Sequence, residues 1–369
     1  MPAHVSRNEG ERMSTETIPQ SDEWLLDSDL GESLHEDEIA IASKIAESIA
    51  ATVRAQHAKD GPPARRDAHP RAHGLVRASV EVEANLAPEL AQGIFVPGKH
   101  YPAWVRFSNG DADPQRSDAK GDVRAMAIKV FDVPGAKILA EERDATTQDF
   151  VMINSPVFIT DHPARYLKAL ERNASANPLV KLSAGLALGF KGASIGLSIQ
   201  GSHISNPLST RYWSTVPYRL GDAPRKQAIK FSAVPQARTR SEPVPGSGPT
   251  FLRDVMAEDL AAGEVLFDFM VQPRTSKVMS VEDSQAEWKE TEAPFFKVAT
   301  IRILRQTFAT DARDRLAENL SFNPWHALPQ HRPLGGVNRI RRIVYRTISD
   351  LRRGLNDVPR REPAACTEP

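Results

Sequence analysis

The sequence contains very little cysteine: Cys366 is the only one in 369 residues. This excludes an internal disulfide and a cysteine-rich zinc site. The chain also lacks net charge, because 47 lysines and arginines balance 47 aspartates and glutamates. No global electrostatic field therefore draws it to nucleic acid or anionic lipid, and we expect no nucleic-acid partner.

Long apolar runs are absent as well. No stretch reaches the roughly eighteen apolar residues of a transmembrane helix, so we expect no integral membrane span. Residues 1–35 are acidic and polar, without the apolar core of a secretory signal. Their composition is typical of disorder. We therefore predict a cytoplasmic protein with a disordered N-terminal tail over 1–35.

Hydrophobic residues make up 40% of the chain, which is enough for a sizeable core. Alternating apolar residues predict strands, and apolar residues at helical spacing predict helices. The small apolar run over 180–200 fits either a buried helix or a flexible lip. We predict an α+β fold in which a curved antiparallel sheet or barrel has helices at its ends. The expected strands are 75–82, 103–107, 123–131, 150–153, 227–234, 265–272 and 295–304, and the expected helices are 36–57, 164–172, 252–262 and 337–355.

The last expected helix carries a candidate metal ligand. Arg341 lies four residues before Tyr345, and Arg352 lies seven after it, so the three side chains share one helix face. A tyrosine binds a metal as phenolate, and both the metal and a neighbouring guanidinium favour that anion. The pattern therefore fits a tyrosinate ligand. A solvated basic helix also explains these residues, and the helix alone does not decide between the two interpretations.

A second candidate lies far earlier in the chain, in the segment Arg66-Asp67-Ala68-His69-Pro70-Arg71. His69 precedes a proline, so we expect it in extended chain rather than in a helix. His69 and His73 have the spacing of a zinc-binding pair on a helix, but Pro70 and Gly74 disfavour that helix. A lone histidine in a loop is usually a surface residue, so this segment by itself does not define a site.

Five segments together resemble the catalases, specifically the short catalase-related haem proteins. They occur in the family's order and cover roughly residues 60–355, which makes the resemblance specific. The segments are 66–71, similar to R-x-x-H-A-K; 105–108, which matches V-R-F-S; 124–129, similar to R-G-F-A-V-K; 149–158, similar to D-L-V-G-N-N-T-P-V-F; and 341–345, similar to R-x-x-x-Y.

The resemblance implies a catalase-like antiparallel β-barrel with surrounding helices over 36–355, followed by a C-terminal tail over 356–369. It implies haem b as cofactor, with its iron bound by Tyr345. His69 would be the distal acid and base, Ser108 would orient its imidazole, and Asn154 would be the distal amide. The implied cofactor-binding residues are Arg66, Arg106, Arg341 and Arg352.

The implied activity is cleavage of a peroxide substrate, either hydrogen peroxide as in catalases or organic peroxides as in peroxidases, through a ferryl intermediate. Departures from the family leave the substrate open. Ile153 stands where the family has the first of two asparagines, and Ala68 is smaller than the family's bulky aliphatic residue and would widen the channel. Few residues follow Tyr345, so the family's C-terminal helical region is missing.

Three alternatives to this activity remain. A wider channel suits fatty-acid hydroperoxides, as in catalase-related allene oxide synthases. A haem-binding protein without turnover would have the same motifs. Separately from the activity, the sequence leaves open whether the chain forms a homo-oligomer. Finally, Gly192-Ala193-Ser194-Ile195-Gly196 fits the nucleophile elbow of serine hydrolases, which needs a strand before the serine and a helix after it.

The proline-punctuated segment 321–336 leads into the tyrosine helix. His326 and His331 are candidate ligands in isolation. We expect instead that the segment wraps the proximal face of the haem, with Trp325 and Leu328 as packing residues.

Overall fold

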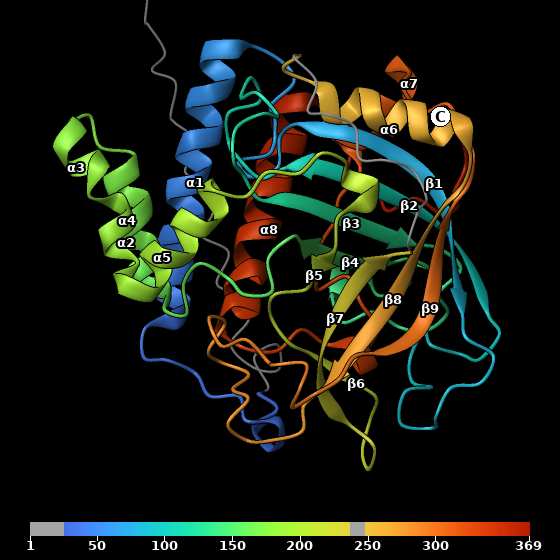
Figure 1. Cartoon of the computed structure of the whole chain (residues 1–369). Coiled ribbons are helices and arrows are strands. Elements are labelled where there is room, and N and C mark those ends of the chain that lie inside the picture. The colour runs from blue at the N-terminus through green and yellow to red at the C-terminus, as the bar shows by residue number, and fades with distance from the viewer. Residues whose placement is uncertain (1–25, 237–247) are drawn as a thin grey trace, which may run out of the picture.

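The computed structural model describes residues 26–236 and 248–369, and it contains a closed antiparallel β-barrel with helices α1 to α5 and α8 on one side (Figure 1). Eight strands form the ring in the order β1-β2-β3-β4-β5-β7-β8-β9, and β9 pairs again with β1. The short strand β6 extends the sheet beside β7. The strands are β1 (Ala72–Val82), β2 (His100–Asn109), β3 (Arg124–Val130), β4 (Gln148–Ile153), β5 (Tyr212–Trp213), β6 (Tyr218–Leu220), β7 (Gln227–Pro235), β8 (Val265–Pro273) and β9 (Phe296–Ile303).

Aromatic and aliphatic side chains fill the interior of the barrel. Alternate residues of each strand point inward. Phe150, for example, meets the rings of Phe231 and Phe269 edge to face, at centroid distances of 5.3 and 5.1 Å. Phe107 lies 5.9 Å from the ring of Tyr212. Because the interior is packed, a ligand site has to lie outside the ring.

The outer face of β2, β3 and β4 is suited to such a site. Along β3 the outward residues include Ala125 and Ala127, whose small side chains leave room above the sheet. Ala125 lies opposite Ser108 of β2, and Ala127 lies opposite Arg106. The alternation that directs apolar side chains into the core therefore directs Arg106 and Ser108 of β2 to the outer face.

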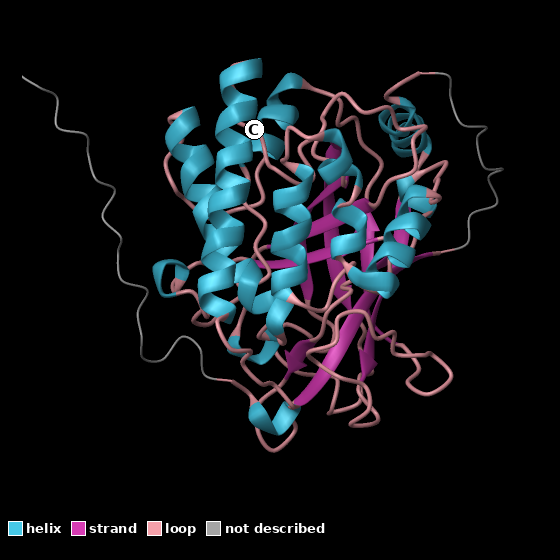
Figure 2. Ribbon diagram, turned by 90° about the vertical axis from the view of Figure 1, so that its left-hand side faces the viewer, coloured by secondary structure: helices cyan, strands magenta, loops and turns pink. Residues whose placement is uncertain are grey.

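Helices cover this outer face (Figure 2). Helices α1 and α8 pack against each other through isoleucines, among them Ile45 and Ile49 of α1 and Ile340 and Ile348 of α8. Helix α2 contacts both, and α3 to α5 form a further layer on α2 (Figure 1). The helices are α1 (Glu38–Asp60), α2 (Pro163–Asn173), α3 (Pro178–Leu182), α4 (Ala184–Ala187), α5 (Gly189–Gln200), α6 (Phe251–Ala262), α7 (Asp311–Asn319) and α8 (Gly336–Asn356), with short 3-10 turns at Ser28–Leu30, Ala140–Glu142, Pro207–Ser209 and Pro329–His331.

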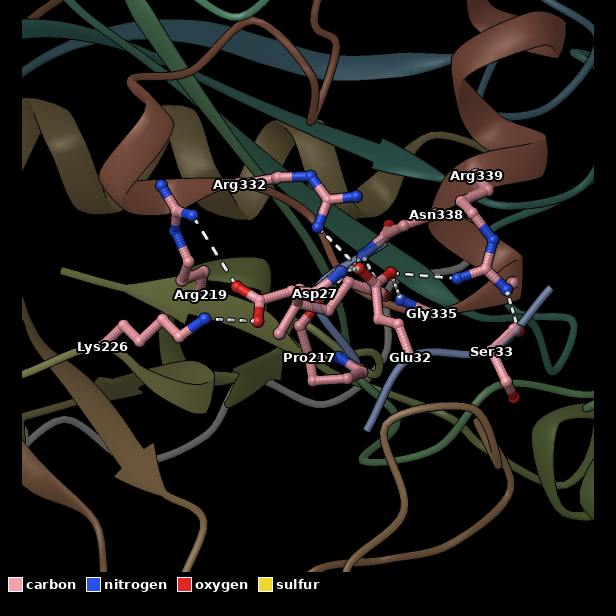
Figure 3. A network of polar contacts seen from close by, with 12 residues as sticks. Asp27, Glu32, Ser33, Pro217, Arg219, Lys226, Arg332, Gly335, Asn338 and Arg339 are labelled. Atoms are coloured by element: carbon pink, nitrogen blue, oxygen red, sulfur yellow. Dashed lines mark hydrogen bonds and ion pairs between the residues drawn. The ribbon is translucent and has the colours of Figure 1, made fainter. Parts of the chain in front are cut away.

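The N-terminal segment 26–35 packs against this domain (Figure 3). The buried carboxylate of Glu32 accepts hydrogen bonds from Arg332 at 2.6 Å, from Arg339 at 2.9 Å and from the backbone N–H of Gly335 at 2.8 Å. A buried charge needs such partners, and these contacts hold the segment in place. The structure therefore differs from the disordered tail predicted over 1–35 in its last part. Residues 1–25 lie outside the described residues.

The C-terminal residues 356–369, predicted as a tail, also lie along the domain. The carboxylate of Glu362 accepts a hydrogen bond from the buried Nζ of Lys129 at 2.7 Å. Cys366 packs against a cluster that contains Trp104 and Phe131. The two ends of the described chain thus contribute buried contacts to the fold.

The predicted α+β fold with an antiparallel barrel and surrounding helices is confirmed. Each expected strand and helix occurs, with its ends shifted by a few residues, whereas β5, β6 and α7 were not predicted. The undecided run over 180–200 contains helices α3 to α5. Ser194 lies inside α5 instead of at a strand-to-helix turn, so the nucleophile-elbow interpretation is wrong. Among the described residues, no helix is long and apolar enough to cross a membrane.

Candidate functional site

A cavity of about 300 Å³ lies between the outer face of β2 to β4 and the helices α1, α2 and α8. Its volume falls within the range of small-molecule and cofactor sites. Seven of the eight predicted site residues line it, although they come from opposite ends of the chain. These are Arg66, His69, Arg106, Ser108, Arg341, Tyr345 and Arg352.

His69 lies in the loop before β1, in a left-handed backbone conformation with φ of 61°. A non-glycine residue seldom adopts this conformation, and its neighbours hold it there. The Arg106 guanidinium donates a hydrogen bond to the His69 carbonyl oxygen at 2.9 Å. The prediction that His69 lies outside a helix is confirmed, but the chain bends at this residue instead of being extended.

The imidazole of His69 is neutral and has a defined tautomer. Its Nδ1 lies 2.9 Å from the carbonyl oxygen of Asn109. Because a carbonyl can only accept, Nδ1 carries the proton and Nε2 keeps a free lone pair. Burial, followed by the charge of Arg106, lowers the pKa of His69 to about 4. At neutral pH the ring can therefore accept a proton at Nε2.

Of the two other residues predicted to act beside His69, Ser108 lies at the cavity and Asn154 does not. Ser108 is buried on the outer face of β2 and lines the cavity. The hydrogen bond that orients the imidazole is made to the Asn109 carbonyl oxygen, directly after Ser108 in the chain. Asn154 is not among the cavity-lining residues: its Oδ1 accepts the backbone N–H of Arg124 at 2.7 Å, which ties together the ends of β3 and β4.

Helix α8 supplies Arg341, Tyr345 and Arg352 from one face, which lines the cavity as their spacing predicted. The Arg341 guanidinium lies over the Phe158 ring, 5.4 Å from its centroid. It also donates a hydrogen bond to Asn338 Oδ1 at 3.3 Å. Tyr345 lies one turn further along the helix. The interpretation of α8 as a simply solvated basic helix does not describe this face.

Three arginines crowd one side of the cavity. Arg66 and Arg352 both pair with the Glu318 carboxylate, Arg66 at 3.4 Å. Arg106 is buried, and its Nε has no hydrogen-bond partner in the part of the chain that the structure describes. Burial, followed by the charge of Arg66, lowers the pKa of Arg106 well below its usual range.

The pKa of Arg352 is also lowered, to about 10, mainly by burial and next by the charge of Arg66. Three guanidinium groups facing one carboxylate leave an excess of positive charge in a desolvated place. The cluster of Arg66, Arg106 and Arg352 therefore fits a ligand with two anionic groups.

Comparison with known proteins finds similarity to catalases in sequence and in structure. No family model matches the chain. A curated relative, the catalase-related peroxidase of Mycolicibacterium paratuberculosis, is 25% identical over 267 residues, which are 70% of this chain and 80% of the relative. The chain is related to the catalases.

Solved catalase structures share the fold of this catalase-related chain. A fungal catalase superposes with a TM-score of 0.64 at 17% identity, covering 82% of this chain and 62% of the fungal protein. Catalase A of Saccharomyces cerevisiae gives 0.59 at 16% identity, covering 83% and 65%. A bacterial catalase gives 0.60 at 16% identity, covering 96% and 67%. The chain thus spans less than two thirds of the length of the first two catalases.

The segment 321–336 of the catalase-related chain lies partly at the cavity, through Ser321, Phe322 and Asn323. Its two histidines are buried elsewhere. His326 contacts Glu142 Oε2 and Thr147 Oγ1, both at 2.5 Å, and His331 Nε2 accepts the backbone N–H of Ile94 at 3.0 Å. Neither histidine lines the cavity. Trp325 and Leu328 are buried, as expected of packing residues, and the wrapping of a haem face by this segment stays a prediction.

Among the cavity residues that were not predicted as site residues, two have a raised pKa. Asp67 lines the cavity beside His69, and burial raises the pKa of its carboxyl to about 6. Tyr166 of α2 also lines it, and burial raises the pKa of its phenol to about 12. The only sequence signal for Asp67 is its place inside the R-x-x-H segment. Tyr166 carries none, because its contact depends on how α2 packs.

Proposed function

We propose that the chain is a haem-dependent enzyme that cleaves peroxides, decomposing hydrogen peroxide or reducing organic peroxides. The observation that carries the proposal is the shared cavity, in which a neutral histidine, a tyrosine and an arginine cluster from distant segments meet. The name of the curated relative, a catalase-related peroxidase, supports the same activity.

The cavity residues fit haem by charge and by donor type. Tyr345 would bind the iron, with Arg341 one turn away favouring its phenolate. Arg66, Arg106 and Arg352 would pair with the two propionates, which would compensate the excess positive charge of the cluster. Haem would supply a redox-active iron, and Tyr345 is the α8 side chain at the cavity whose type is known to bind haem iron.

The protein's part in the reaction is proton transfer at His69. Its free Nε2 would accept a proton from one peroxide oxygen and return it to the other as the O–O bond breaks. The hydrogen bond from Nδ1 to the Asn109 carbonyl fixes the ring for both steps. The roles of Ser108 in orienting the ring and of Asn154 as the distal amide remain predictions from the resemblance.

One observation favours a second substrate class. Ala68 lines the cavity beside His69, and further lining comes from apolar residues such as Ile45 and Ile49. A small residue next to the catalytic base, in a largely apolar cavity, suits bulky substrates. Conversion of fatty-acid hydroperoxides is therefore the alternative function of the same site. Cytoplasmic localisation and a homo-oligomeric state remain predictions.

The test uses the full chain, expressed with ample porphyrin precursor and purified with its haem. Oxygen release after addition of hydrogen peroxide measures catalase activity, and oxidation of an organic donor measures peroxidase activity. Free haemin at equal concentration is the control. We expect at least one activity far above the control. Normal haem loading without either activity, and without conversion of a fatty-acid hydroperoxide, would identify a non-catalytic haem protein and contradict the proposal.

A further inference from the structure

The helices α3 to α5 form an outer lobe, defined here as residues 178–200, that exposes many large apolar side chains. Six of the twelve large hydrophobic residues that are exposed in the described chain lie in this lobe. Phe190 is 94% exposed and Leu182 is 83% exposed. Clustered exposed apolar residues mark interaction surfaces, whereas scattered ones need no explanation. The six are Leu179, Val180, Leu182, Leu186, Phe190 and Leu197.

The inner side of the outer lobe is already attached to the domain. Leu188 is buried, and α5 approaches the chain so closely at Gly192 that an added Cβ would lie 2.7 Å from the carbonyl oxygen of Ile159. On the outer side, Phe190 and Leu197 are seven residues apart on α5 and share one helix face. The exposed side chains are therefore available to a partner without unpacking the lobe.

The charged side chains of the outer lobe are all basic. From Arg172 to Gln200 the sequence has no aspartate or glutamate, and the lobe itself carries Lys181 and Lys191. Lys191 lies 3.8 Å from an Asp283 oxygen. Within the described residues, neither Lys181 nor the exposed Lys168 of neighbouring α2 has an ion-pair partner. Apolar side chains flanked by unpaired cations complement an anionic, apolar partner.

We propose that the outer lobe docks the protein on an anionic phospholipid surface. Helix α5 has 12 residues and is about 18 Å long, shorter than the roughly 30 Å of a bilayer core, so it would lie in the plane of the interface. The attraction is local, since the whole chain has no net charge. A second copy is a poorer occupant, because a two-fold interface through this lobe would bring like charges together.

Docking through this lobe would hold the cavity near the lipid. Ile159, against which Gly192 packs, lies between Phe158 and Thr160, and both of these line the cavity. The surface interaction itself needs neither haem nor peroxide. It therefore goes beyond the proposed function and can be tested separately from it.

The experiment is sedimentation of the purified full chain with vesicles of equal parts phosphatidylcholine and phosphatidylglycerol, or of phosphatidylcholine alone. The lobe variant is Leu182→Ser, Phe190→Ser and Leu197→Ser. The matched control, Val96→Ser, Val278→Ser and Leu304→Ser, changes three exposed apolar residues outside the lobe. We expect wild type and control to bind the mixed vesicles, and the lobe variant to bind about tenfold or more weakly.

A second variant, Lys168→Glu with Lys181→Glu, keeps the apolar side chains and should lose the preference for anionic vesicles. Wild-type protein that stays in the supernatant would overturn the proposal, as would equal binding by lobe variant and control. A concentration-dependent dimer that the lobe variant abolishes, without vesicle binding, would assign the lobe to a second copy instead. Peroxide cleavage, measured on the same samples, tests the proposed function independently.

Discussion

At the scale of single residues, His69 combines a strained backbone with a neutral ring. A left-handed conformation at a non-glycine residue costs about 1–3 kcal/mol and persists only where its surroundings impose it. Here the Asn109 carbonyl holds the ring and the Arg106 guanidinium holds the backbone. Both contacts come from the end of β2, so the strand register determines where Nε2 lies.

Replacing His69 tests its role as acid and base. His69→Ala should keep the haem absorbance and lose peroxide cleavage by about 10²- to 10⁴-fold, the usual contribution of a positioned acid–base group. The exposed His203→Ala is the matched control and should behave like wild type. Initial rates of peroxide loss, normalised to haem, provide the measurement. A His69→Ala variant with wild-type rates would remove this residue from the mechanism.

The pH profile should reflect the lowered pKa of His69. The neutral ring is the active form, so kcat/KM should persist as pH falls through 6.5 and drop only near pH 4. Between pH 6.5 and pH 4 the histidine is protonated in the unfolded chain but not in the folded one, so the free energy of unfolding decreases as the pH falls through this range. Rates should therefore be measured within seconds of a pH jump. An acid midpoint near 6.5 would contradict a buried, desolvated imidazole.

Ala68 is the residue on which substrate size should depend. Ala68→Val narrows the cavity beside His69 and should raise the ratio of hydrogen peroxide to cumene hydroperoxide turnover. The measurement is kcat/KM for both peroxides on wild type and variant at equal haem loading. An unchanged ratio would show that this side chain does not control access.

Most of the predicted site residues lie together in the structure, and their roles stay predictions. Seven of the eight predicted residues line the cavity because they belong to the family-like segments at both ends of the chain. Asn154 is the predicted residue that does not line the cavity, because its amide oxygen accepts a hydrogen bond from the Arg124 backbone N–H. Asp67 and Tyr166 could not be predicted, since burial by neighbouring elements gives them their properties.

At the scale of elements, strand alternation predicts the barrel better than length or composition. Each apolar-alternating run became a strand, because one face of it had to be buried. The two-residue β5 and the three-residue β6 are too short to show any period. Helix α7 is rich in charged residues, and its short apolar face, which includes Leu316 and Ala317, is too small to show a helical period in the sequence.

One of the contacts that hold the N-terminal segment is made by a buried carboxylate. The Glu32 side chain is 0% exposed and is surrounded by Arg332, Arg339 and backbone N–H groups. Glu32→Gln should lower the free energy of unfolding by about 3 kcal/mol, since Arg332 loses its carboxylate partner. Arg339 keeps its ion pairs with Glu38 and Glu282, so we expect the low end of the range for a broken buried pair.

A matched control is available in the same segment. The side chain of Asp29 is 77% exposed and, among the residues that the structure describes, pairs only with Lys226 at the surface. Asp29→Asn should therefore leave the free energy of unfolding nearly unchanged. Urea unfolding followed by circular dichroism measures both variants. Equal effects of the two substitutions would mean that residues 26–35 are not packed as the structure describes.

At the scale of the whole molecule, the cavity exists only in the folded chain. The predicted arginine, histidine and tyrosine side chains that line it come from a loop before β1, the outer face of β2 and helix α8. Local pattern identified each of these pieces, but only the register of β1 to β4 and the packing of α8 on α1 bring them together. The grouping of these residues was therefore predictable from the resemblance to a family and not from local sequence pattern alone.

The most direct test of this assembly is a haemin titration of the apo full chain, followed by absorbance in the Soret region. We predict saturation at about one haemin per chain, and a weakened affinity with an altered visible spectrum for Tyr345→Phe, which removes the proposed iron ligand. Wild-type protein that shows no saturable Soret change, or a Tyr345→Phe variant identical to it, would contradict the assignment of the cavity as a haem site.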